Sequence, residues 1–231
     1  MTLAATLVTT AFQTAVLVLF LVAVRRGNVP AAVNGFAALV LAVLPTLFDI
    51  VLQTRLGPTL PLWVATAGIL HSLGMLGLYE STWWWDHLTH TVSAALLAAL
   101  LYAATLVTTP DLFGITDDSV VAAVVTVGLT LAVGVFWEVF ELVARAIGDR
   151  YDIQPVLVHY GWEDTLFDLV FDLVGALLIV VAGLRVFVPI AETYPEVAGT
   201  LLVGSVWVVA VGSVALGLSL VVGRAGDSIS R

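Results

Sequence analysis

The chain has 231 residues, of which 61% are hydrophobic and only 11% are charged, and its mean hydropathy is +1.09. Soluble domains carry about 25% charged and about 45–50% apolar residues, and a single globule of this size cannot bury so large an apolar excess. The composition therefore excludes a soluble globular protein, and we expect membrane lipid to solvate much of the chain.

The charged residues limit the kinds of partner that the chain can bind and indicate the kind of organism it comes from. The formal net charge is −9, all eight basic residues are Arg, and the chain contains no Cys. Nucleic acid is not expected as a partner, because binding it requires a basic patch, and the absence of Cys excludes disulfides and thiolate ligands. An acidic chain without Lys is typical of proteins that work in strong salt. We therefore expect a halophilic archaeon as the source.

Seven apolar stretches each approach the 20 or so residues that a membrane-spanning helix needs. Pro and Gly interrupt the chain at several of the short connections between them, and the longest connection is expected at about 147–163. We predict an all-α fold, a polytopic transmembrane bundle of about seven helices that forms one domain over residues 1–231. The expected helices cover approximately 3–24, 30–52, 60–79, 86–107, 118–146, 164–188 and 197–222.

The distribution of Arg predicts the orientation of the bundle. If the N-terminus lies outside, the inner loops and the C-terminal tail hold six of the eight Arg, and the outer loops hold only Arg55 and Arg185. Cytoplasmic loops of membrane proteins carry the excess of basic residues. The chain is therefore expected in the cell membrane, with its N-terminus outside and its C-terminus in the cytoplasm.

Ionisable residues gather in three of the expected helices. At mid-membrane each costs at least about 2.5–3.5 kcal/mol, so such residues indicate function by default. Within each group the spacing of three or four residues places the side chains on one helical face. The groups are Asp86 with His90 at the start of the fourth helix, Glu138 with Glu141 late in the fifth, and Asp164, Asp168 and Asp172 at the start of the sixth.

These groups are expected on one side of the membrane, because successive helices alternate in direction, and the Arg distribution makes that side cytoplasmic. Carboxylates in a low dielectric need cations or protons. Carboxylate with imidazole suits Zn, Mn or Fe, whereas carboxylate with water suits Mg or Mn. We predict one or two divalent metal ions (Mg, Mn, Zn or Fe) on five ligands, with Glu141 or Asp172 as a base or supporting group. The ligands are Asp86, His90, Glu138, Asp164 and Asp168.

Several of the polar residues also have structural interpretations. Asp86 and Asp164 occupy helix N-termini, where Asp caps free N–H groups and interacts well with the helix dipole. Asp49 is expected to be an interfacial residue at a helix end. His71 lies mid-helix and is a candidate for lining an inner cavity, and His159 in the long loop is a candidate for covering the site.

The order and spacing of the three groups resemble the YjdF-like group of inner-membrane proteins and, more loosely, VanZ-like proteins. The resemblance covers about 86–182, and the chain departs from the pattern in its third acid, Asp172, and in Leu142, where the pattern has an aromatic residue. It implies an integral membrane protein with a shared polar site and implies no activity. The matching residues are Asp86 with His87 or His90, Glu138, Glu141, Asp164, Asp168, Gly175 and Ala176.

Three functions stay open at this point. The first is a metal-dependent membrane enzyme on a lipid-linked substrate or another small molecule, in which the metal activates water and neutralises phosphate charge; the chain has no nucleophile motif or phosphate-binding Gly loop. The second is an ion- or proton-coupled transporter, which uses acidic and His side chains as relays. The third is a membrane scaffold with a structural ion. Membrane lipid is the one expected partner, and the oligomeric state is not predicted.

Overall fold

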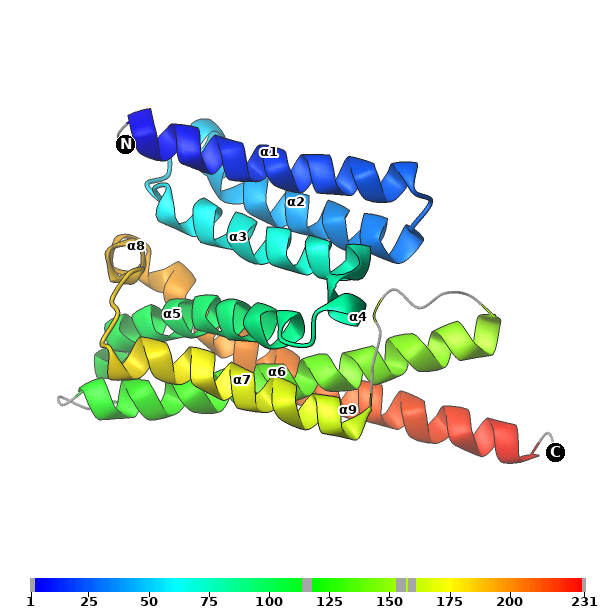
Figure 1. The fold of residues 1–231 in the computed structure, drawn as a ribbon. Coiled ribbons are helices and arrows are strands. Elements are labelled where there is room, and N and C mark those ends of the chain that lie inside the picture. The colour runs from blue at the N-terminus through cyan, green and yellow to red at the C-terminus, as the bar shows by residue number, and fades with distance from the viewer. Residues whose placement is uncertain (1–2, 114–117, 153–156, 158–160, 230–231) are drawn as a thin grey trace. The chain divides into compact units, whose positions relative to one another are not determined.

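The computed structural model describes residues 3–113, 118–152, 157 and 161–229, and this described part of the chain is helical without any strand (Figure 1). The predicted all-α class is confirmed. In chain order the elements are α1 (Leu3–Arg25), α2 (Val29–Val51), α3 (Thr59–Leu73), the π-helical turn η1 (Gly74–Leu78), α4 (Tyr79–Ser81), α5 (Trp85–Phe113), α6 (Asp118–Tyr151), α7 (Trp162–Val181), α8 (Val188–Thr193) and α9 (Pro195–Ile229).

Six helical segments within the described residues are long and apolar enough to cross a membrane. The seventh expected span, α7, has 20 residues, which correspond to about 30 Å of helix, but four of these residues are acidic. The architecture is therefore a multi-pass membrane bundle, close to the predicted seven helices. The six segments are Leu3–Arg25, Val29–Val51, Thr59–Ser81, Trp85–Thr108, Val120–Tyr151 and Pro195–Leu218.

The chain divides into two compact units, Met1–Leu96 and Leu97–Arg231. In the first unit, α1, α2 and α3 lie side by side, and each packs against the other two (Figure 1). Their common core contains one small or branched side chain from each helix, Val16, Ala42 and Ala65. Such side chains let membrane helices approach closely, which supplies van der Waals contact where lipid provides no hydrophobic driving force.

Polar side chains fix the arrangement of α1 and α2 in the first unit. The amide of Gln13 on α1 donates hydrogen bonds to the carbonyl of Ala42 at 2.9 Å and to the hydroxyl of Thr46 at 2.8 Å. Asn28 precedes α2, and its side-chain oxygen accepts a hydrogen bond from the Ala31 N–H at 3.0 Å. This N-cap satisfies one of the donors that a helix start leaves free.

In the second unit, α6 packs against both α7 and α9, and α8 packs against α9 (Figure 1). Glycines lie at both contacts of α6. A Cβ atom at Gly134 would meet side chains of α7, and a Cβ atom at Gly212 on α9 would meet the ring of Phe136 on α6. α6 therefore packs against two other helices of this unit, and its contact with α7 joins two of the acidic groups.

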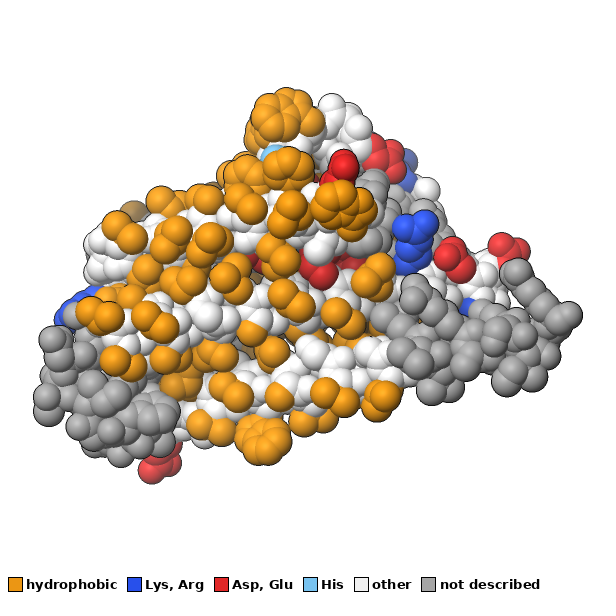
Figure 2. Space-filling view, turned by 90° about the horizontal axis from the view of Figure 1, so that it is seen from below, with side chains coloured by type: hydrophobic (Ala, Val, Ile, Leu, Met, Phe, Trp, Pro, Cys, Tyr) orange, Lys and Arg blue, Asp and Glu red, His pale blue; other side chains and the backbone are white. Residues whose placement is uncertain are grey.

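Large apolar side chains remain at the surface. Hydrophobic side chains predominate over the face drawn in Figure 2, and on α9 the residues Trp207, Val211 and Val214 are 65%, 58% and 62% exposed. Soluble monomers rarely expose contiguous apolar patches of more than a few hundred Å². A surface of this kind is expected where lipid covers the protein.

Four helix ends lie five or more residues from the prediction. α5 ends at Phe113 rather than near 107, and α9 ends at Ile229 rather than near 222. α6 continues to Tyr151 rather than ending near 146, because hydropathy marks the edge of the lipid and a helix can continue beyond it. α7 ends at Val181 rather than 188, where Gly183 turns the chain with a φ of +61° that glycine adopts without strain. As a result, Asp172 lies at the midpoint of α7 rather than in its first third.

Candidate functional site

Three acidic side chains are buried in the second unit. Glu138 of α6 is 5% exposed, and Asp168 and Asp172 of α7 are 2% and 7% exposed. The hydroxyl of Thr165 donates a 2.6 Å hydrogen bond to Oε2 of Glu138 and so ties α7 to α6. Because Thr165, Asp168 and Asp172 follow at intervals of three and four residues, they share one face of α7. The structure thus brings Glu138 to the acidic face of α7.

Asp172 packs directly against the backbone of α6. A Cβ atom built at Gly134 would clash with Oδ2 of Asp172 and would lie 3.1 Å from Cδ2 of Leu169. Gly134 is four residues before Glu138, so both lie on the face of α6 that meets α7. The two helices can approach this closely because glycine leaves room for the Asp172 carboxylate.

The acids of α7 extend from its first turn to its middle. Asp164 lies in the first turn and is half-buried, where a negative charge interacts well with the helix dipole. Asp172 is eight residues further along, which corresponds to about 12 Å of helix rise. This series of carboxylates therefore occupies one half of α7.

Glu141 has a more accessible position than Glu138. Its side chain is half-buried, and Oε1 accepts a 2.8 Å hydrogen bond from the indole N–H of Trp137. Trp137 is 37% exposed. The two glutamates of α6 therefore have different surroundings, since Glu138 binds α7 and Glu141 binds a side chain of its own helix.

Asp86 and His90 form the expected pair at the start of α5, in the first unit. Oδ1 of Asp86 lies 4.0 Å from Nε2 of His90, and both side chains are half-buried. His87 lies in an edge contact with the ring of Trp83, with the ring centroids 6.0 Å apart. Asp86 and His90 thus share one face of α5, as their spacing predicts, and His87 contacts an exposed indole.

The predicted ligand set draws on both compact units. Asp86 and His90 belong to the first unit, and Glu138, Asp164 and Asp168 belong to the second. Each pair or group is arranged within its own unit as described above. That all five residues bind a common metal ion stays a prediction.

A second polar group in the first unit surrounds His71. The imidazole Nδ1 lies 2.7 Å from the Tyr79 hydroxyl, and Nε2 lies 3.3 Å from Oδ1 of Asn34. The π-helical turn η1 separates His71 from Tyr79, and Gly77 within it has a φ of +125°. π-helical turns are rare and occur frequently at functional sites. His71 is therefore held at both ring nitrogens by side chains of α2 and α4.

Asp49 stabilises the connection after α2. Its carboxylate accepts hydrogen bonds from the Thr54 hydroxyl at 2.7 Å and from the Leu56 and Gly57 N–H groups at 2.8 and 3.0 Å. This is a loop-fixing role in addition to the expected position at a helix end. His159, the residue expected to cover the site, lies outside the described residues.

Sequence reasoning missed three residues that support the acids, Thr165, Gly134 and Trp137. Thr165 and Gly134 could have been identified from spacing, since each lies one helical turn from a predicted ligand on the same face. Trp137 lies one turn before Glu141, and a Trp and a Glu four residues apart on a helix are neighbours. Each signal is visible only after the acids themselves have been selected.

A family model described as "Predicted membrane protein (DUF2238)" matches residues 7–188. The matched range is most of the chain and includes every residue of the predicted ligand set. This match confirms the expected resemblance at the level of a membrane-protein family.

An uncharacterized protein of Thermotoga maritima is 26% identical over 133 residues, which are 57% of this chain. The chain covers 65% of the length of that relative. Neither this relative nor the family model supports the looser similarity to VanZ-like proteins. No solved structure matches the chain.

Proposed function

We propose that this chain, which belongs to the DUF2238 family of predicted membrane proteins, binds a divalent metal ion through its acidic residues. The supporting observation is the burial of Glu138, Asp168 and Asp172 in one pair of packed helices. Removing carboxylates from water is costly unless cations or protons compensate their charge. A divalent cation compensates two carboxylates at once and bonds to their oxygens directly.

The ligand chemistry depends on which residues take part. Glu138, Asp164 and Asp168 offer only oxygen atoms, which suit Mg or Mn, whereas the addition of His90 beside Asp86 suits Zn, Mn or Fe. We propose all five as ligands, on the argument that helix alternation expects them on one side of the membrane. The metal preference of the protein then tests whether His90 is a ligand. Replacing His90 by Gln should shift that preference from Zn toward Mg.

The proposed reaction is metal-dependent chemistry on a lipid-linked substrate at the cytoplasmic interface. The metal would polarise a phosphate oxygen and lower the pKa of bound water. Glu141 is the better placed of the two proposed bases, because it is half-buried beside an exposed indole. Asp172 packs against Gly134, and we propose that it supports the metal ligands rather than acting as the base.

Elemental analysis of the purified full chain tests the metal site. We expect a stoichiometric divalent metal, with loss of at least half of it in Glu138→Gln and in Asp168→Asn. Glu163→Gln is the matched control, because Glu163 is an exposed acid in the same first turn of α7 as Asp164. Wild-type protein without metal after incubation with Mg, Mn, Zn and Fe would contradict the proposal.

Hydrolysis of a lipid phosphate in mixed micelles tests the enzyme function. We expect phosphate release that requires the metal and that falls at least a hundredfold in Glu141→Gln, while its metal content stays unchanged, because removal of a general base costs about 10²–10⁴-fold in rate. A metal-loaded protein that hydrolyses no lipid phosphate would favour the transport function or a structural ion.

An ion- or proton-coupled transporter is the second candidate. The observation that favours it is the position of Asp172 at the midpoint of α7, because a relay needs ionisable groups within the membrane. Asp49 contributes less to such a path, since its carboxylate binds the loop at 54–57. Cation or proton flux in proteoliposomes that is lost in Asp172→Asn would support transport over the enzyme.

The proposed orientation can be tested because the chain has no Cys. Asp149→Cys and Glu192→Cys would place single thiols at exposed positions on opposite expected sides. With the C-terminus in the cytoplasm, an impermeant maleimide should label whole cells at Glu192→Cys only. Labelling at Asp149→Cys alone would mean that the orientation is the reverse of the proposed one.

The salt-adapted source is tested by thermal unfolding of the purified chain. We expect its unfolding temperature to fall when KCl is reduced from molar to millimolar concentration.

A further inference from the structure

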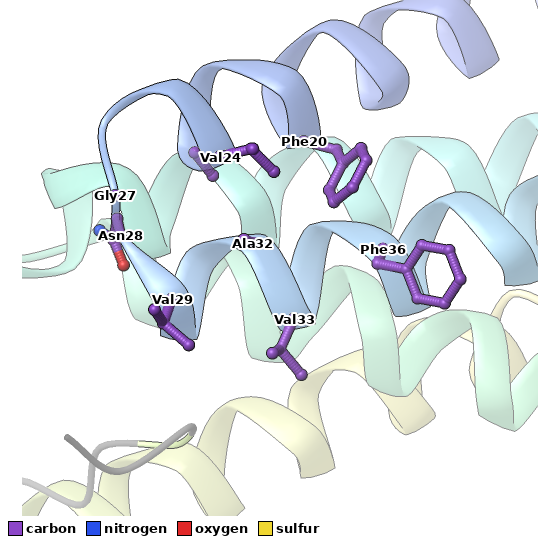
Figure 3. A pocket seen from close by; sticks show the side chains of 9 residues that line it. Phe20, Val24, Gly27, Asn28, Val29, Ala32, Val33 and Phe36 are labelled. Carbon is purple, nitrogen blue, oxygen red and sulfur yellow. The ribbon is translucent and has the colours of Figure 1, made fainter. Parts of the chain in front are cut away.

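The first unit contains an apolar groove at the junction of α1 and α2 (Figure 3). Its volume is about 390 Å³, which is within the range of small-molecule sites, about 300–1,000 Å³. Apolar side chains make up most of its lining, and the one polar side chain is at the helix junction. The principal lining residues are Phe20 and Val24 on α1, Asn28, and Val29, Val33 and Phe36 on α2.

Close packing further along the helices forms the inner end of the groove. A Cβ atom at Gly35 would lie 3.3 Å from Cα of Phe20, so α1 and α2 nearly touch there. The rings of Phe20 and Phe36 lie beside each other, with centroids 5.9 Å apart, and Figure 3 shows them at the end of the groove that is away from Gly27. The groove thus has an aromatic end within the helices, and its other end lies at the turn of Gly27 and Asn28.

Two arginines lie in sequence between Val24 and Gly27, two of the residues that line the groove. Arg25 is the last residue of α1 and Arg26 follows it, and both are exposed. They are the only adjacent basic residues in a chain of net charge −9, and in the described part of the chain neither has an ion-pair partner. The Asn28 side chain is occupied, because it caps α2 and donates to the carbonyl of Met75. The turn therefore presents an uncompensated positive charge beside an apolar groove.

We propose that this groove binds one anionic phospholipid, with an acyl chain along Val24 and Val33 toward the phenyl rings and the phosphate on Arg25 and Arg26. Phe20 precedes Arg25 by five residues, which is about 7.5 Å of helix rise, so the aromatic end lies at acyl-chain depth when the arginines lie at headgroup depth. Guanidinium groups bind phosphate through two parallel hydrogen bonds. Because the rest of the protein is strongly acidic, we expect an anionic lipid to be attracted to this turn.

Native mass spectrometry of the full chain in detergent tests the proposal, with phosphatidylglycerol and phosphatidylcholine of matched acyl chains as probes. We expect one phosphatidylglycerol to be retained in preference to phosphatidylcholine. Each arginine near an anionic lipid contributes about 1 kcal/mol, so Arg25→Gln and Arg26→Gln should each weaken retention about fivefold.

Val33→Trp fills the groove and should abolish the selective retention. Val40→Trp is its matched control, because Val40 lies on the same helix, is similarly exposed and does not line the groove. Equal retention of the two lipids by the wild type would mean bulk lipid only and would overturn the proposal, as would Val33→Trp binding like the control. Neither variant should alter the metal content, so this test is independent of the proposed metal site.

Discussion

Replacing Gly134 by alanine tests the close packing of α6 on α7 that holds the buried acids together. The new Cβ atom would clash with Oδ2 of Asp172 and lie 3.1 Å from Cδ2 of Leu169. The carboxylate must then rotate away or the helices must separate. Either response disturbs the packing that encloses Asp172.

The size of the effect follows from two opposing contributions. Overpacking a tight contact costs about 1–3 kcal/mol, whereas alanine is favoured over glycine inside a helix by about 0.8–1.0 kcal/mol. We therefore expect Gly134→Ala to lose up to about 2 kcal/mol of stability. Gly128→Ala is the matched control on the same helix, because no atom lies within 4 Å of its added Cβ, and it should gain up to about 1 kcal/mol.

Thermal unfolding of the purified full chain in detergent, followed by tryptophan fluorescence, measures both variants. A double-mutant cycle with Asp172→Ala identifies the cause, because this change removes the carboxylate that the new Cβ would meet. We expect the cost of Gly134→Ala to fall by about 1–2 kcal/mol in that background, as is usual for residues in contact. Equal stability of the two alanine variants, or an unchanged cost in the Asp172→Ala background, would refute the reasoning.

Three further predictions concern single hydrogen-bonded groups. Asp49→Ala should lower the stability by about 1.5–3 kcal/mol, the value of one hydrogen bond to a charged group, because its three donors are part-buried and bonds to water replace much of what they lose; the same unfolding assay measures it, and an unchanged midpoint would exclude the loop-fixing role. Thr165→Val should cost about 1.5–3 kcal/mol through the lost bond to Glu138, while Thr165→Ser should retain most of it; equal loss in both would assign the effect to packing. The neutral His71 should carry its proton on Nε2, because Asn34 donates its own N–H to a backbone carbonyl and turns its oxygen to the imidazole; ¹⁵N NMR that finds the proton on Nδ1 would contradict this.

The membrane helices could be predicted from the sequence because lipid imposes a simple requirement. A spanning segment must satisfy its backbone internally and expose about 20 apolar residues, and α1, α2 and α5 begin within one residue of the expected positions. The ends of α6 and α7 could not be predicted in this way. Hydropathy reports the edge of the lipid, whereas a helix ends where its backbone turns, as at Gly183.

Part of the candidate site could likewise be predicted from the sequence, and part could not. Spacing alone places Asp86 and His90 on one face of α5, and the structure gives them a contact of 4.0 Å. The role of Asp49 could not be predicted, because it depends on how the loop at 54–57 folds back onto its carboxylate. An acid that fixes a loop and an acid that binds a metal have the same appearance in a sequence. Only the donors around them distinguish the two.

The negative charge of the buried acids on α6 and α7 can be compensated by a bound cation or by bound protons, and the two affect the stability of the protein differently. An ionised carboxylate taken out of water into a protein interior costs several kcal/mol unless its charge is compensated, so three of them would cost about as much as the entire stability of a domain, roughly 5–15 kcal/mol. Most of this cost must be offset in the folded protein by a cation or by protons. A cation present at a hundred times its dissociation constant contributes about 2.7 kcal/mol that a chelator removes.

Compensation by protons would depend on pH and not on a chelator, because a folded state that binds more protons than the unfolded chain becomes more stable as the pH falls. With a metal ion on Glu138 and Asp168, a chelator at neutral pH should lower the unfolding temperature of the wild type and leave Glu138→Gln nearly unchanged. With protons alone, the chelator should have no effect and acidification should raise the unfolding temperature. Thermal unfolding with and without chelator at two pH values therefore decides between a metal centre and a protonated relay before any substrate is known.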